Sequence, residues 1–471
     1  MNEPQDHDLK DIQGLIYRGW TKHPYAGFLF ARLPDFALDG GARARQWLRA
    51  IANDVTAVVH GPGDGRLQLA LSYTGLRALG VPDDVIGALP GEMQKGMASR
   101  QASLADTDPA TWTLGGPERP LDVLVLVYAR DEAGRAREMA AQRAALEAIG
   151  AHVYPDELST PLTDSREHFG FADGLSQPFL PGLHDEPRPG EDRVPAGEIL
   201  LGYPNAYRQT PLSPTWGHVD LGRNGSYLVF RKLAQNVAGF WGWLAEHARR
   251  IAGDDPAGAA ALTEWLGAKV VGRWPSGAPL VLTPERDDPA FAAPEHRNAF
   301  KYLAHDPDGM RCPISSHIRR ANPRDARGGS AAESELVVSR HRILRRGRSF
   351  GAPLDPDAAR RGQDDGATRG LYFLCLQSSI ARGFEFIQQT WLANPGFAGL
   401  YGEPDPIIGD NRVRLGHHCA HPERTRRYHI TIPADPVRLR LENVPTVVSN
   451  LGGEYFLLPS IKALHRIARG P

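Results

Sequence analysis

The 471-residue chain has only three cysteines, Cys312, Cys375 and Cys419, and it lacks any long apolar run. An odd, sparse set of cysteines does not form a disulfide framework, and it fits a reducing compartment. No apolar stretch approaches the roughly 20 residues that a membrane-spanning helix needs. The polar first residues contain no secretory or twin-arginine signal. The sequence therefore predicts a cytoplasmic protein with no membrane partner.

The chain also lacks an excess of either charge, because 54 Lys and Arg against 55 Asp and Glu leave a formal net charge of -1. A nucleic-acid partner would need a basic field, so none is expected. No Gly-x-x-x-x-Gly-Lys-Ser/Thr phosphate loop is present. The length allows two domains or one large one. The oligomeric state stays open, and a homo-oligomer is compatible with the sequence.

Hydrophobic patterning predicts an α+β fold in which one arrangement occurs twice. The first half reads β-α-β-β-α-β, which is a ferredoxin-like order, with strands at 25–33, 67–72, 121–128 and 151–154 and helices at 41–55 and 132–149. The second half repeats much of it, with strands at 226–233 and 370–377 and helices at 236–251 and 383–392. We therefore expect two similar halves, joined near residues 180–220.

A carboxylate, Asp173, stands among apolar residues in the segment 168–178 (HFGFADGLSQP). Gly170 and Gly174 let the backbone turn tightly. Apolar surroundings should raise the pKa of the Asp173 carboxyl, which makes this group a candidate acid or base. The alternative is an aspartate that bonds the backbone of its own turn, which is the commonest use of Asp beside Gly.

A histidine, His317, opens the segment 317–324 (HIRRANPR). A neutral imidazole is a usual proximal ligand of haem iron, and its second ring nitrogen would need an acceptor such as a carboxylate. Arg320 follows one helical turn later on the same face and could pair with a haem propionate. In the alternative interpretation the arginines of this segment form a solvated basic face.

Arg345 ends the apolar run 343–345, where an unpaired guanidinium would be costly to bury. A fixed positive group beside a peroxide would stabilise the negative charge that develops on the leaving oxygen. Arginine does not give up its proton, so it would assist rather than act as the base. Arg346 is adjacent, and periodicity does not choose between the two.

A cluster of three histidines and one cysteine occupies residues 417–421 (HHCAH). This spacing does not place four ligands around one tetrahedral zinc ion without help from elsewhere in the chain. A polar loop or edge strand is the preferred interpretation. A non-haem protein with a structural metal at this cluster remains an alternative.

Taken together, these segments resemble the dye-decolorising peroxidase family over nearly the whole chain. The family's Gly-x-x-Asp-Gly signature stands at 170–174, its histidine segment at 317–324 and its distal arginine segment at 343–347. Supporting matches occur at 11–14, 197–205, 383–391 and 452–459. So many matches in the right order are far more specific than one short pattern.

The resemblance implies two ferredoxin-like halves with antiparallel sheets, packed as a dimeric α+β barrel-like unit. Residues 1–200 would carry the Gly-x-x-Asp-Gly motif at their end, and residues 201–471 would carry the haem site. The implied protein is a haem b peroxidase that uses hydrogen peroxide to oxidise phenolic compounds and dyes. A haem-handling protein similar to deferrochelatases is the alternative.

The resemblance also implies a role for each matched residue. His317 would be the proximal iron ligand, with Asp405 as the carboxylate behind it. Asp173 would be the distal acid/base and Arg345 the distal charge stabiliser. Arg320 would meet a haem propionate.

Trp391 matches a position where some family members carry an oxidisable surface aromatic, and the alternative is a half-buried packing residue. The chain departs from the family after the distal arginine, where a proline is missing and Phe350 replaces a tyrosine. Phe350 has no phenol to oxidise, so Trp391 is the better candidate for electron transfer at the surface.

Overall fold

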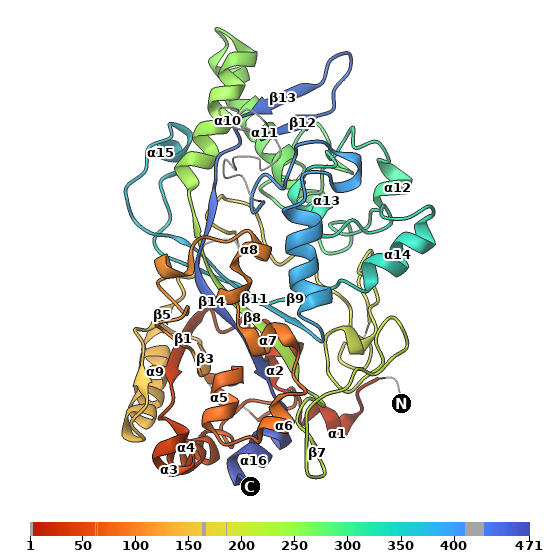
Figure 1. Ribbon diagram of the computed structural model, residues 1–471. Coiled ribbons are helices and arrows are strands. Elements are labelled where there is room, and N and C mark those ends of the chain that lie inside the picture. Colours follow the sequence, from red (N-terminus) through yellow and green to blue (C-terminus); the bar gives the residue numbers. More distant parts are fainter. Residues whose placement is uncertain (1–2, 62, 64, 163–165, 185, 410–427) are drawn as a thin grey trace, which may run out of the picture.

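The computed structural model describes the chain except residues 1–2, 62, 64, 163–165, 185 and 410–427. A large antiparallel sheet runs through the molecule, with the strand order β10-β11-β8-β14-β2-β3-β1-β4 (Figure 1). Two short strands lie off this path, since β5 (Glu157–Leu158) pairs with β1 and β9 (Leu344–Arg345) pairs with β11. Within the described residues, no helix is long and apolar enough to cross a membrane.

The first half of the chain supplies one end of the sheet. Its strands and principal helices follow the β-α-β-β-α-β order as β1 (Tyr25–Arg32), α4 (Ala42–Ile51), β2 (Gly65–Leu71), β3 (Val123–Ala129), α9 (Glu132–Ala148) and β4 (His152–Val153). The pairing order is β2-β3-β1-β4. Every residue of β3 (VLVLVYA) is buried, because both faces of the sheet are covered and a β-branched apolar run suits that position.

The second half repeats this arrangement. Its elements are β8 (Ser226–Gln235), α10 (Val237–Ala252), β10 (Arg348–Phe350), β11 (Gly370–Gln377), two π-helical turns (Ala381–Glu385 and Ile387–Leu392) and β14 (Val448–Leu458). The pairing order β10-β11-β8-β14 corresponds strand for strand to β2-β3-β1-β4 of the first half. The expected α+β fold with two ferredoxin-like halves is confirmed. The boundary at residue 200 stays a prediction.

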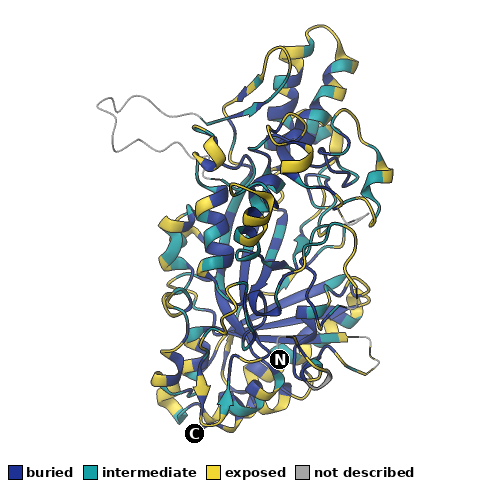
Figure 2. Ribbon diagram, turned by 90° about the vertical axis from the view of Figure 1, so that its right-hand side faces the viewer, coloured by how far each residue is buried: buried dark blue, intermediate teal, exposed yellow. Residues whose placement is uncertain are grey.

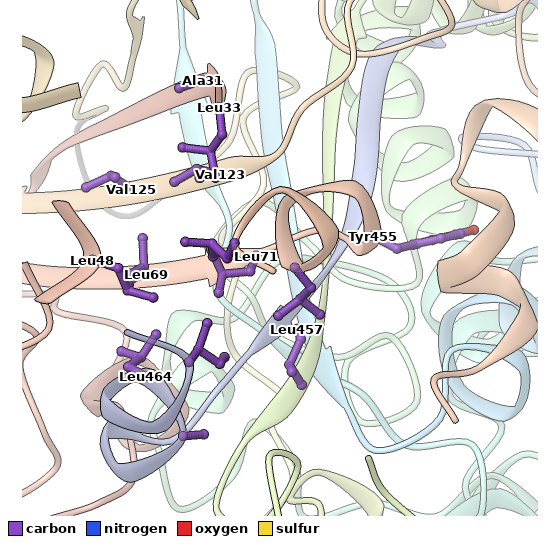
Figure 3. Close-up of a cluster of buried hydrophobic side chains, with 14 of the residues drawn as sticks. Ala31, Leu33, Leu48, Leu69, Leu71, Val123, Val125, Tyr455, Leu457 and Leu464 are labelled. Carbon is purple, nitrogen blue, oxygen red and sulfur yellow. The ribbon is translucent and has the colours of Figure 1, made fainter. Parts of the chain in front are cut away.

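The two halves meet where β14 pairs with β2, at Leu457 opposite Leu71. The sheet does not close into a barrel, because β4 and β10 stand at its two ends and no strand pairing between them occurs in the described residues. Leu464 from α16 (Ile461–Arg469) and Leu48 from α4 pack beside strand residues of both halves (Figure 3). The halves therefore share one core.

The rest of the chain forms short elements and an upper region around α10 and α11 (Pro256–Val271). The short helices are α1 (Asp6–Leu9), α2 (Gly14–Tyr17), α3 (Phe36–Asp39), α5 (Tyr73–Ala78), α6 (Asp83–Ile86), α7 (Gly91–Lys95), α8 (Gln101–Leu104), α12 (Tyr302–His305), α13 (His317–Ala321), α14 (Ala331–Ser339) and α15 (Pro356–Arg360). The hairpins β6–β7 (Thr215–Trp216, Val219–Asp220) and β12–β13 (His429–Ile432, Leu439–Glu442) form separate two-stranded sheets. Buried residues follow the large sheet, and exposed ones the outer helices (Figure 2).

Candidate active site

A cavity of about 290 Å³ brings together His317, Asp173 and Arg345, three residues that lie far apart in the chain. A single buried water needs only roughly 10–15 Å³, so this cavity has room for a sizeable ligand. Many of its walls are apolar, including Phe169, Phe171, Leu175, Leu233, Val271, Phe373, Phe384, Ile387 and Ile407. An apolar cavity with a few convergent polar groups is typical of a cofactor site.

His317, the first residue of α13, is held by a buried carboxylate. Its Nδ1 lies 3.0 Å from Oδ2 and 3.2 Å from Oδ1 of Asp405, which is fully buried. Burial acts against the imidazolium, but the Asp405 carboxylate outweighs it and raises the pKa of His317. Among the described residues none bonds Nε2 of His317. This nitrogen is therefore available to a ligand in the cavity.

The loop that carries Asp405 is itself fixed. Its Oδ1 accepts hydrogen bonds from the backbone N–H groups of Ile407 and Ile408, each at 2.9 Å. Burial raises the pKa of the Asp405 carboxyl, but the neighbouring His317 and these bonds hold it below its usual value. A carboxylate with fixed acceptors orients the imidazole and makes its other nitrogen a better electron donor.

Asp173 and Arg345 form a second acid–base pair on the cavity wall. Arg345, in β9, donates from Nη1 to Oδ1 of Asp173 at 3.1 Å, and its backbone N–H donates to Oε1 of Gln177 at 3.1 Å. The Asp173 side chain is 38% exposed and that of Arg345 34%. Both groups therefore remain reachable from the cavity.

The expected upward shift of the Asp173 pKa is wrong. Burial does push the pKa up, but the Arg345 charge, a backbone hydrogen bond from Gly174 and the bond from Arg345 together lower it below its usual value. Apolar neighbours in the sequence indicated a dry setting, whereas the deciding partner is 172 residues away. Asp173 is held as a carboxylate.

The structure separates Arg345 from Arg346, which periodicity left open. The Arg346 guanidinium is buried and donates to the backbone carbonyls of Leu15 (2.8 Å) and Ile16 (2.9 Å). It ties α2 to the link between β9 and β10. Arg345 is the arginine that faces the cavity.

Arg320 does not fit its expected contact with a propionate. It is fully buried and is not part of the cavity wall. Its guanidinium donates to backbone carbonyls, those of Trp391, Leu392, Asn394 and Glu403. This side chain joins α13 to the end of the π-helical segment and to the loop before Asp405, so its donors are already engaged.

Trp391 does not occupy the expected surface position. Only 2% of it is exposed, and it lines the cavity from the second π-helical turn. It contacts His341, with ring centroids 5.3 Å apart, and Phe386 at 5.4 Å. A large reductant on the surface cannot touch this indole.

Four buried arginines line the cavity besides Arg345, namely Arg231, Arg273, Arg324 and Arg342, and none of them was expected to hold a ligand. Burial and the neighbouring Arg324 lower the pKa of Arg273 to about 9, and Arg342 donates to Oδ2 of Asp192 at 2.6 Å. Arg273 and Arg324 already donate to the Asn298 side chain and to backbone carbonyls. Guanidinium groups suit carboxylates, so Arg342, which within the described residues bonds only Asp192, keeps donors for the acidic groups of a ligand. Arg324 ends the histidine segment and Arg342 directly precedes the apolar run 343–345, so the sequence singled out the surroundings of both.

Glu167 was also missed, although it directly precedes the segment 168–178. It lines the cavity and accepts hydrogen bonds from the backbone N–H groups of Phe169 (2.9 Å) and Phe171 (3.0 Å) and from Nε2 of Gln235 (2.6 Å). Burial raises its pKa to about 7. These bonds shape the turn that leads to Asp173.

The residues present fit haem. The imidazole with a free Nε2 suits the iron, and the apolar cavity suits the macrocycle. A buried guanidinium group suits a propionate. In the described part of the chain, no cluster of three or more His, Cys, Asp or Glu could hold a metal ion. The cluster at 417–421 lies outside the described residues.

Comparisons with known proteins give the following similarities. No family model matches the chain. The dye-decolorizing peroxidase msp1 of Mycetinis scorodonius is 32% identical over 477 residues, which covers 98% of this chain and 87% of that protein. A solved structure of a dye-decolorizing peroxidase in complex with 2,6-dimethoxyphenol aligns over 98% of this chain and 99% of the other, with a TM-score of 0.78 and 27% identity. The deferrochelatase of Yersinia pestis is 33% identical over only 114 residues, which are 24% of this chain and 20% of that protein.

Proposed function

The chain belongs to the dye-decolorizing peroxidase family and is a peroxidase, and from that premise we propose that it binds haem b at His317 and oxidises phenolic compounds and dyes with hydrogen peroxide. One observation carries the proposal. A single apolar cavity contains both an imidazole backed by a buried carboxylate and a separate carboxylate–guanidinium pair. These are the two groups of side chains that a haem peroxidase needs.

We assign the iron to Nε2 of His317, since Asp405 holds Nδ1. The Asp405 contact selects the tautomer in which Nδ1 carries the proton and Nε2 has the free lone pair. Arg342 would pair with a propionate, because within the described residues only its Nη1 is engaged, by Asp192. Bound haem would supply the iron that binds peroxide and the oxidising equivalents that reductants consume.

We assign the proton movement to Asp173. Breaking the O–O bond of peroxide requires a proton to leave one oxygen and reach the other. The lowered pKa keeps Asp173 ionised in mildly acidic solution, so it can accept that proton and then return it. Arg345, 3.1 Å away, would stabilise negative charge on the departing oxygen.

The reductants are proposed to be phenols and dyes, because the relative solved with 2,6-dimethoxyphenol binds such a phenol. Two electrons reduce one hydrogen peroxide to two waters, and each phenol or dye molecule gives one. A cytoplasmic location also remains a proposal that follows from the sequence alone.

An absorption spectrum of the purified protein, taken before and after one equivalent of peroxide, tests the proposal. We expect a Soret band that changes within the mixing time, and peroxide-dependent oxidation of 2,6-dimethoxyphenol. A protein that shows no Soret band after haem supplementation, or a Soret band that peroxide leaves unchanged, contradicts the proposal.

The second candidate is removal of iron from haem, which the short match to deferrochelatase favours. Anaerobic incubation with haem separates the two functions. Iron-free porphyrin retained by the protein supports the second candidate, whereas recovery of intact haem supports the peroxidase.

A further inference from the structure

A second cavity lies at the lower end of the molecule in Figure 1, where α16, β7 and the start of the chain come together, away from the cavity that contains His317. We call it the α16 cleft, and its volume is about 660 Å³. Among the described residues that line it, only Val219 is apolar. A wall of this composition suits a charged ligand and does not suit a macrocycle.

One face of α16 supplies the basic wall of this cleft. Four residues of the helix line it, namely Lys462, His465, Arg466 and Arg469. Lys462 and Arg466 are four residues apart, and so are His465 and Arg469, so all four share one side of the helix. Like charges at this spacing destabilise a helix. Because α16 contains no acidic residue, it cannot balance the charge itself.

The acidic residues of the cleft are already engaged. Nδ2 of Asn224 donates to Oδ1 of Asp8 at 3.0 Å and to Oδ2 of Asp11 at 2.9 Å. Oδ1 of Asp11 accepts the backbone N–H of Lys462 at 2.7 Å, and Asp220 bonds the backbone of its own turn. Asp8 is only 2% exposed and Asp11 only 5%. The two buried aspartates therefore hold the wall together and offer little surface to a ligand.

The basic side chains, in contrast, are open. Lys462, Arg469 and His218 are exposed, and their side chains make no hydrogen bond or ion pair with another described residue. Arg466 is fixed, because its Nε donates to the Trp216 carbonyl at 3.3 Å and its Cζ lies 3.7 Å from the centroid of the Trp216 ring. Burial and the neighbouring Arg469 charge lower the pKa of Arg466. Positive charges thus act on one another here.

A second fixed guanidinium comes from outside α16. Arg223, just before β8, donates from Nη1 to the Gly202 carbonyl at 3.1 Å, and its Cζ lies 4.9 Å from the centroid of the Tyr203 ring. Planar guanidinium groups held in place match the oxygens of phosphate groups. The cleft therefore combines two fixed guanidinium groups with open cations.

We propose that the α16 cleft binds a small polyanion, a chain of two or three phosphates, either free or at the end of a nucleotide. Lys462 and Arg469 are seven residues apart, which is about 10 Å along the helix axis. A single phosphate contacts neighbouring cations only, whereas a chain of phosphates follows the row. This site is independent of the peroxidase function, since none of its residues lines the cavity of His317.

The test uses the purified haem-loaded protein with inorganic triphosphate as the probe, in the absence of magnesium and of peroxide. Isothermal titration calorimetry measures the affinity at low and at high salt. We expect binding at low salt that high salt weakens. The Lys462→Gln/Arg469→Gln double variant should bind triphosphate about tenfold more weakly at low salt. No binding to the unmodified chain, or equal affinity in the double variant, overturns the site.

Arg249 and Arg250 provide the matched control. They are exposed residues in the last turn of α10, in the upper region of the molecule (Figure 1). Arg249→Gln/Arg250→Gln changes the net charge by the same amount, so it should keep the affinity of the unmodified chain. An equal loss in both double variants would assign the binding to the overall charge of the protein and overturn the cleft.

ATP distinguishes the two sources of the phosphate chain. Because the cleft has almost no apolar wall, we expect ATP and inorganic triphosphate to bind with similar affinity. Binding of ATP more than about tenfold tighter would overturn a site built for phosphates alone. In the Lys462→Gln/Arg469→Gln variant, kcat/KM for 2,6-dimethoxyphenol should stay unchanged. Failure of the unmodified chain to oxidise this phenol would contradict the proposed peroxidase and leave the triphosphate result standing.

Discussion

Two acid–base pairs meet at the same cavity, Asp173–Arg345 on its wall and His317 on its wall with Asp405 behind it, and they differ in how their carboxylates are held. Asp405 is fully buried and fixed by His317 and two backbone N–H groups. Asp173 is 38% exposed and lies beside the equally open Arg345. One aspartate is placed so that its partner cannot turn, and the other so that a small molecule can reach it. The same side chain thus suits ligand positioning at one point and proton transfer at the other.

Replacing His317 by alanine should have the largest effect, because it removes the proposed iron ligand itself. We expect most bound haem to be lost, measured as the Soret absorbance per protein. His341, a second histidine of the cavity wall whose Nδ1 is already engaged by the Arg382 carbonyl, is the matched control. If His341→Ala loses haem and His317→Ala keeps it, the iron ligand is His341 and the comparison of the two pairs fails.

Replacing Arg345 by leucine should leave haem bound and slow the reaction with peroxide. Loss of one charge aimed at a developing oxyanion lowers the rate by about 100-fold or more. Stopped-flow absorbance at the Soret band measures this rate directly. Arg345→Lys keeps the charge and should retain more of the rate than the leucine variant. Equal rates in the leucine variant and the unmodified chain would show that the Asp173–Arg345 pair takes no part in peroxide chemistry.

Local signals in the sequence were sufficient for the strands of the fold and marked Asp173 and His317 as candidates, whereas Arg345 was chosen over Arg346, and Asp405 was found, only through the family resemblance. The runs of β3 and β11 are apolar enough to identify buried strands, and a glycine-flanked aspartate marks a special turn. The expected contact of Arg320 with a propionate was wrong, because helical spacing predicts the face of a helix on which a residue lies but not what packs against that face. Here carbonyls from residues 391–403 cover it.

Trp391 and the buried arginines of the cavity show two other limits of sequence reasoning. The surface position of Trp391 was expected from the family resemblance, which aligns a residue in the sequence but does not show what packs over it; in the structure His341 and Phe386 contact its ring. Arg273, Arg324 and Arg342 reach the cavity from separate loops. Only tertiary packing brings them together, so no spacing in the sequence marks them as a group.

Replacing Asp405 by asparagine should affect haem binding and activity less than either substitution above. It tests what the charge of this buried carboxylate contributes. The amide can still accept the N–H bonds of Ile407 and Ile408, but it carries no charge for His317. Loss of such a partner typically weakens metal binding by about 10- to 100-fold. Haem transfer to apomyoglobin measures the change. Haem affinity equal to that of the unmodified chain would mean that Asp405 supports only the loop.

Glu167 adds an intermediate case to the comparison, since it is a cavity-wall carboxylate held by hydrogen-bond donors and by no cation in the described residues. Burial raises its pKa from 4.5 to about 7. The folded protein therefore binds this proton more tightly than the unfolded chain does. The resulting stability is fully present below pH 4.5 and is lost as the pH rises through about 7.

Glu167→Gln removes this pH dependence and should change activity least of the four substitutions. Each unit of pKa is worth about 1.4 kcal/mol, so relative to the variant the unmodified chain should lose at most about 3 kcal/mol of unfolding free energy between these pH values. Chemical denaturation across that range measures the loss. Glu454, another buried carboxyl with a pKa of about 7, is not part of the cavity wall and serves as the control. Bound haem should enlarge the pH-dependent loss of unfolding free energy at Glu167 but not at Glu454, because haem displaces water from the cavity wall. If haem changes this loss equally for both residues, Glu167 lies outside the haem environment.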